Sequence, residues 1–257
     1  MSGLPARTGW AWLKEGAALL RQQPGALIFL LLTNMLVSGV LSRIPVLGPV
    51  LLSALIPALS LAFMRACLMI QHGQRVPPAV LLTGLHKPAV FNLMKIGLLY
   101  LLAIAVLAGL SRLFVSAEFI AQFQPPFDPA KRPEGRLVDT LIVLLMSILS
   151  MGVVLVVSYA APLIYWQKMA VGKSLFYSFF GVMRSLRAFL ILLLSWCGIF
   201  MTFLLITQLL LGAGKLGFLV TSTVLILGVI LMQCALYCGY RQIFGVPDAD
   251  VAPGSVK

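Results

Sequence analysis

Six long apolar runs, separated by short polar segments, constrain this chain more than any other feature. About 20 apolar residues suffice for a helix to cross the hydrocarbon core of a bilayer. Runs of about that length or longer occupy 26–42, 50–70, 90–114, 137–166, 188–211 and 218–240. The sequence therefore predicts an all-α, polytopic membrane helix bundle of about six transmembrane helices.

Composition supports this class and leaves little room for another domain. Of 257 residues, 61% are hydrophobic and 10% are charged, whereas soluble domains are about 45–50% apolar and about 25% charged. We therefore expect one integral membrane domain over 1–257. The first apolar run is expected to be a retained helix rather than a signal peptide, because a basic segment precedes it and no A-x-A-like site follows.

Basic amphipathic segments precede the hairpins. Within 9–21, apolar residues recur at helical spacing from Trp10 to Leu20, and the charged residues lie elsewhere on the helical wheel. That pattern is typical of a helix in the membrane interface. Segments 71–88 and 167–187 are also basic. We expect two or three interfacial amphipathic helices that form a basic collar on one membrane surface.

The succession of basic segment, span, connection and returning span occurs three times, over 9–70, 71–166 and 167–244. This order predicts a threefold repeat whose units share one orientation, unlike the inverted repeats of many transporters. The alternative is that a basic helix end entering a membrane produces the similarity without duplication.

Lysine and arginine placement predicts the orientation. If both termini and the segments 71–88 and 167–187 are cytoplasmic, thirteen of the nineteen Lys and Arg residues lie inside, as the positive-inside rule requires. Anionic lipids of the inner leaflet are then sufficient partners for the net charge of +12. No nucleic acid is expected as a partner, and a membrane protein partner is compatible with the pattern.

Small residues recur every four positions in the second run, at Ala54, Ala58, Ala62 and Ala66. Such a ridge allows close approach of helix backbones in a membrane. We expect it to be a buried helix–helix contact, with Leu61 facing lipid.

Ionisable residues inside a membrane are candidate functional groups. Arg65, Lys95 and Arg112 lie within about two turns of a span end, where long side chains reach the interface. Residues expected to contact anionic lipid are Arg21, Arg65, Arg75, Lys87, Lys173, Arg184 and Arg187. The alternative is that these charges only set topology.

Neutral polar groups lie deeper in the spans, at Asn34, Gln208 and Gln233. We expect each to bond a neighbouring helix. The four cysteines, Cys67, Cys197, Cys234 and Cys238, all fall in apolar runs, so they are expected to be small packing residues and not disulfides.

Catalytic and metal-binding patterns are absent from the sequence. No carboxylate lies near a span centre, and His72 and His86 have no acid or cysteine at ligand spacing. The phosphate loop G-x-x-x-x-G-K-[ST] and the motifs H-E-x-x-H and G-x-S-x-G do not occur. The sequence predicts no catalytic residue, no metal site and no cofactor.

The stretches GWAWLKEGAALLRQQPGALIFLLL (9–32) and IPVLGPVLLSALIPALSLAFMRACLMIQHGQ (44–74) resemble a family of uncharacterised multi-pass inner-membrane proteins of proteobacteria, especially beta-proteobacteria. More loosely, the layout is similar to the membrane domain of glycerophosphodiester phosphodiesterases, without their catalytic part. The resemblance implies an inner-membrane location and a multi-pass architecture, and it supplies no functional residues.

Three functions fit these observations. The first is a non-enzymatic scaffold or accessory subunit of the inner membrane. The second is a carrier or flippase-like protein for lipids or other apolar molecules, which a cavity lined by the neutral polar residues would favour. The third, a membrane-embedded enzyme, lacks paired acid and base residues.

Overall fold

The computed structural model describes residues 4–45, 47–85, 89–116, 119, 137–212 and 214–246. Over these residues it is helical, without strands. Its elements are α1 (Arg7–Gln22), α2 (Pro24–Ser42), α3 (Leu47–Gln71), the 3-10 helix η1 (Pro78–Leu85), α4 (Ala89–Phe114), α6 (Leu137–Gln167), α7 (Val171–Arg184), α8 (Leu186–Leu211) and α9 (Lys215–Phe244). Among the described residues, six helices are long and apolar enough to cross a membrane, which confirms the predicted all-α polytopic bundle.

Turn residues set several helix boundaries close to the predicted positions. Pro24 lies in the first turn of α2, where its missing N–H removes no helical hydrogen bond. At the end of α8, Gly212 adopts a φ of 60°, a left-handed conformation that glycine reaches without steric cost. This glycine turns the chain from α8 into α9.

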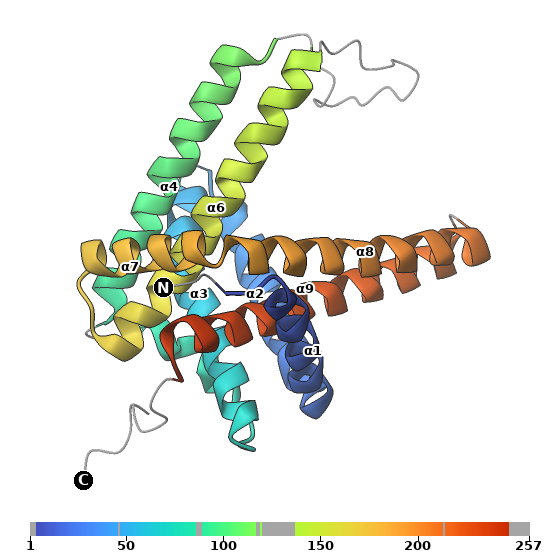
Figure 1. Ribbon diagram of the computed structural model, residues 1–257, viewed down its shortest axis with the longest axis horizontal. Coiled ribbons are helices and arrows are strands. Elements are labelled where there is room, and N and C mark those ends of the chain that lie inside the picture. Colours follow the sequence, from blue (N-terminus) through green and yellow to red (C-terminus); the bar gives the residue numbers. More distant parts are fainter. Residues whose placement is uncertain are drawn as a thin grey trace.

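The long helices form three hairpins, α2–α3, α4–α6 and α8–α9. Figure 1 shows α4–α6 and α8–α9 leaving a common region in different directions. Burial follows this arrangement: apart from Asp139, the buried residues of α6 lie between Val157 and Ile164, and those of α4 are Leu93, Ile96 and Gly97. We call the common region, where the hairpins meet each other and α1, the base.

Helix α3 lies at the centre of the base. Half of its most apolar 18-residue window is buried, against 6% of the corresponding window in α6 and 17% in α2, α4 and α8. The largest buried cluster joins α3 to α1 and α9 through residues such as Trp12, Cys67 and Tyr237. The hairpins are therefore held together at the base, and most of their remaining length faces outward.

The amphipathic segments take three forms. Helix α1 covers the predicted segment 9–21, whereas 167–187 is divided at Ser185 into α7 and the start of α8. The segment 71–88 contains the 3-10 helix η1, whose Val80, Thr83 and Gly84 are buried. Two amphipathic α-helices are within the two or three that were expected. In the third segment, a cluster of Pro and Gly residues and tight packing on α3 favour a short 3-10 helix.

Element order follows the pattern of the sequence. A short or amphipathic helix precedes each hairpin, in the series α1–α2–α3, η1–α4–α6 and α7–α8–α9. The threefold duplication behind this order stays a prediction.

Candidate functional site

The closest contact in the base is made by α1, which crosses α8 and α9. A side chain at Gly9 would meet the carbonyl oxygen of Ala188, and one at Gly16 would meet the backbone nitrogen of Ala235 at 2.8 Å. Both positions therefore need glycine because helix backbones approach directly. The amphipathic helix α1 is therefore part of the packed interior.

Trp12 fixes α1 in this position. It is fully buried, its ring packs at 5.2 Å from that of Phe189, and its indole N–H donates a hydrogen bond to Gln242 at 2.5 Å. Arg241 forms an ion pair with Glu15 on the exposed side of the same contact. An open hollow of about 500 Å³ lies beside this ion pair and also includes Arg7 and Thr8.

An aromatic cluster joins α6 to α8 and α9. Tyr159 donates a hydrogen bond from its hydroxyl to the carbonyl oxygen of Leu236 at 3.0 Å. Its ring packs against Phe189, Tyr240 and Phe244, with centroid separations of 5.8–6.0 Å. Sequence analysis did not single out Tyr159, because an aromatic residue in an apolar run carries no sign of its partners.

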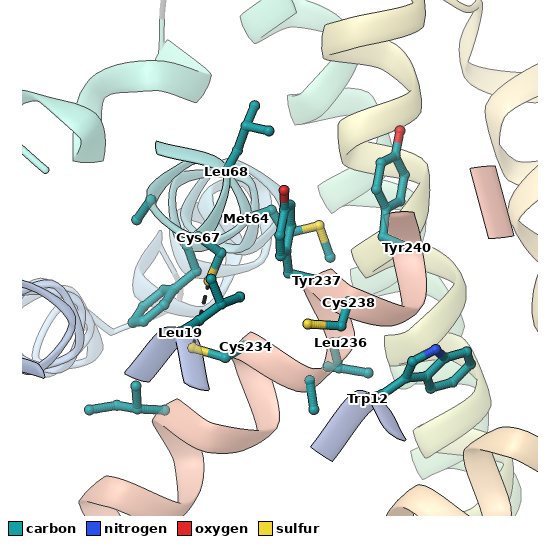
Figure 2. Packing of buried hydrophobic residues seen from close by; sticks show 14 of the residues in the cluster. Trp12, Leu19, Met64, Cys67, Leu68, Cys234, Leu236, Tyr237, Cys238 and Tyr240 are labelled. Atoms are coloured by element: carbon teal, nitrogen blue, oxygen red, sulfur yellow. Dashed lines mark hydrogen bonds between the residues drawn. The ribbon is translucent and has the colours of Figure 1, made fainter. Parts of the chain in front are cut away.

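Three of the cysteines gather in the base, as Figure 2 shows. Cys67 of α3 and Cys234 of α9 form a thiol–thiol hydrogen bond of 3.6 Å, and Cys238 is buried nearby. All four cysteines are free thiols, and Cys197 is partly buried on α8. Over the described residues, no group of three or more His, Cys, Asp or Glu side chains is arranged to hold a metal ion.

The alanine ridge lies inside the base. Ala54, Ala58, Ala62 and Ala66 are each at most 6% exposed. A side chain at Gly97 of α4 would meet the Cα atom of Ala54 at 2.5 Å, and one at Gly84 of η1 would meet that of Ala58 at 2.7 Å. The ridge thus receives two elements at backbone distance.

Leu61, which sequence analysis expected to face lipid, is fully buried instead. It packs with Ala58, Leu93 and Ala161. The expectation is wrong because α4 and α6 pack against this side of α3.

Arg65 lies beside the ridge and points between three elements. Its guanidinium donates to the hydroxyl oxygen of Thr83 at 2.9 Å and to that of Tyr165 at 3.4 Å. These partners come from η1 and the end of α6. The structure therefore places two neutral hydroxyl groups against this cation.

The remaining residues expected to contact anionic lipid are dispersed. Arg21, Arg75, Lys173, Arg184 and Arg187 are exposed on α1, α7, the start of α8 and the loop before η1, and Lys87 lies outside the described residues. Lys173 lies over the ring of Tyr177, 5.8 Å from its centroid. Their binding of anionic lipid stays a prediction.

The neutral polar residues occupy separate positions. Asn34 accepts a hydrogen bond from Ser38 of the same helix at 3.4 Å, Gln233 is partly buried and Gln208 is exposed. None of the three lines the hollow beside the Glu15–Arg241 ion pair or the hollow between α2 and the start of η1.

Asp139 makes a polar contact that sequence analysis did not predict. It is 4% exposed, and its two carboxylate oxygens accept hydrogen bonds from the backbone N–H and the hydroxyl of Ser116, at 3.0 and 2.8 Å. This contact closes the far end of the α4–α6 hairpin. The signal in the sequence was an acidic residue close to the start of the apolar run 137–166.

Comparison with known proteins gives one significant match among curated proteins, and it extends along almost the whole chain. A probable inner membrane protein of Burkholderia thailandensis is 28% identical over 266 residues, which cover 98% of this chain and 95% of that protein. No family model matches, and no solved structure matches. The likeness to the membrane domain of glycerophosphodiester phosphodiesterases finds no support in these comparisons. Together, the relative and the six apolar helices identify the chain as a multi-pass inner-membrane protein.

Proposed function

We propose that this protein is a non-enzymatic scaffold or accessory subunit of the inner membrane, with both termini in the cytoplasm. The observation that carries the proposal is the contrast between the base and the hairpins. The base is joined by backbone-distance contacts at Gly9, Gly16 and Gly97, whereas four of the six spans have at most 17% of their apolar 18-residue stretch buried. Diverging hairpins on a packed base offer long helix faces to other membrane proteins.

The internal arrangement favours a scaffold over a carrier. A carrier for apolar molecules needs an internal path, and the large cluster around Trp12 and Tyr237 fills the region where the hairpins meet. Asn34, Gln208 and Gln233, the expected lining of such a path, lie on three different helices, α2, α8 and α9, and Gln208 is exposed.

Site-specific photocrosslinking in intact cells tests the proposal. A photoreactive residue at Leu144 or Leu205, which are 55% and 70% exposed, should give an adduct with one defined membrane protein. The matched control is Leu163, which is fully buried and should crosslink only within the chain. Adducts with lipid alone, at every exposed hairpin position tried, would contradict the scaffold.

Reconstitution distinguishes the carrier. Purified protein in vesicles should leave the transbilayer movement of a fluorescent phospholipid at the rate of empty vesicles. A protein-dependent acceleration would favour the carrier over the scaffold.

A further inference from the structure

Arg65 combines a full positive charge with an apolar stem and neutral hydrogen-bond partners. One turn away on the same helix face, Leu61 and Leu68 are at most 5% exposed. The single ion pair among the described residues is that of Glu15 with Arg241, so no described carboxylate neutralises Arg65. A cation in apolar surroundings is costly unless an opposite charge accompanies it.

The hydroxyl groups around Arg65 orient it. Thr83 is 1% exposed and donates its own hydroxyl hydrogen to the carbonyl oxygen of Val80 at 2.6 Å, so its oxygen remains available to accept from Arg65. Tyr165 accepts a second bond from the same guanidinium nitrogen. Arginine has five N–H donors in a planar fork. Both hydrogen bonds of Arg65 come from one guanidinium nitrogen. Its other two nitrogens are therefore free to face a ligand.

The position of Arg65 near the ends of α3 and α6 suits the depth of lipid headgroups. Arg65 is six residues before the end of α3, which corresponds to about 9 Å along the helix axis. Tyr165 and the adjacent Trp166, whose rings lie edge to face at 6.3 Å, end α6 on the same side, and such residues are enriched at the membrane–water interface. Arg65 is only partly buried, so a headgroup has access to it.

We infer that Arg65, oriented by Thr83 and Tyr165, binds the phosphate group of an anionic phospholipid between α3, η1 and α6. A planar guanidinium matches the oxygens of a phosphate in a bidentate arrangement. The phosphate supplies the missing negative charge, and the Tyr165 hydroxyl, which accepts from Arg65, has its own hydrogen free to donate to the phosphate. Because the site depends on contacts within one chain, it is independent of the proposed scaffold function.

Native mass spectrometry of the full chain in mild detergent tests this site, with phosphatidylglycerol, zwitterionic phosphatidylcholine and inorganic phosphate as probes. Wild-type protein should retain one phosphatidylglycerol in preference to phosphatidylcholine. Arg65→Gln should weaken this binding by at least about tenfold, as expected for loss of charge-assisted bonds. The matched control is Arg7→Gln, which removes an equal charge from an exposed position at the start of α1 and should change binding less than about twofold.

The outcomes separate the alternatives. Equal loss in Arg65→Gln and Arg7→Gln, or no loss in either, would overturn the site in favour of a diffuse basic surface. Equal retention of the two lipids would also overturn it. Binding of inorganic phosphate that competes with phosphatidylglycerol would assign the same phosphate chemistry to a soluble ligand. If Arg65→Gln does not fold, Tyr165→Phe removes one orienting hydroxyl from a folded protein. It should reduce lipid retention, and unchanged retention would refute the inference.

Discussion

The docking of α1 onto α8 and α9 gives the most direct test of the fold. Gly9 and Gly16 lie on one face of α1, two helical turns apart. A methyl group at Gly9 would meet backbone atoms of Ala188 and Leu192, and one at Gly16 would meet the backbone of Ala235. Because these neighbours are backbone atoms, they cannot rotate away. The double variant Gly9→Ala with Gly16→Ala must therefore displace α1.

The expected magnitude follows from two opposing effects. Overpacking costs about 1–3 kcal/mol per site, and alanine gains about 0.8–1.0 kcal/mol per site over glycine within a helix. The double variant should thus be destabilised by about 2 kcal/mol. Gly109→Ala with Gly152→Ala is the matched control, because nothing lies within 4 Å of either new methyl group. That variant should be stabilised by about 2 kcal/mol.

Thermal unfolding in detergent measures the difference. For a chain of this size, about 1 kcal/mol corresponds to about 2–4 °C, so the two double variants should differ by roughly 8–16 °C. Trp12 emission should also shift to longer wavelength in the Gly9 and Gly16 variant, because its buried ring becomes hydrated. Equal melting temperatures with unchanged emission would refute the close docking of α1.

Three further predictions test other parts of the structure. Ala62→Leu should lower the melting temperature by an amount equivalent to about 1–3 kcal/mol, whereas Ala105→Leu, at an exposed position of α4, should leave it nearly unchanged; similar melts would show that the ridge is not tightly packed. Asp139→Asn should accelerate hydrogen exchange at the far end of α4 while exchange in α1 stays constant, because the contact with Ser116 holds only that end; uniform exchange would contradict this local role. Cysteines at Gln74 and Gly172 should be protected from an impermeant thiol reagent in intact cells and one at Pro126 should be labelled; the opposite pattern would reverse the proposed orientation.

The sequence by itself determined the class of fold and the approximate position of every span. Apolar length decides whether a segment crosses a bilayer, and this property is local, so the six runs correspond to α2, α3, α4, α6, α8 and α9. The sequence also predicted that one helix face carries Ala54, Ala58, Ala62 and Ala66, since four-residue periodicity places residues on one face. The match to an inner-membrane protein agrees with that class.

Only the tertiary structure decided which helices meet. In an apolar run, a residue that faces lipid and one that faces another helix have the same hydrophobicity, so Leu61 gave no sign of its burial. The hydrogen bonds of Arg65 with Thr83 and Tyr165 join residues 18 and 100 positions apart, and the contact of Cys67 with Cys234 spans 167 positions. Such contacts depend on how the hairpins are placed around α3, which no local pattern specifies.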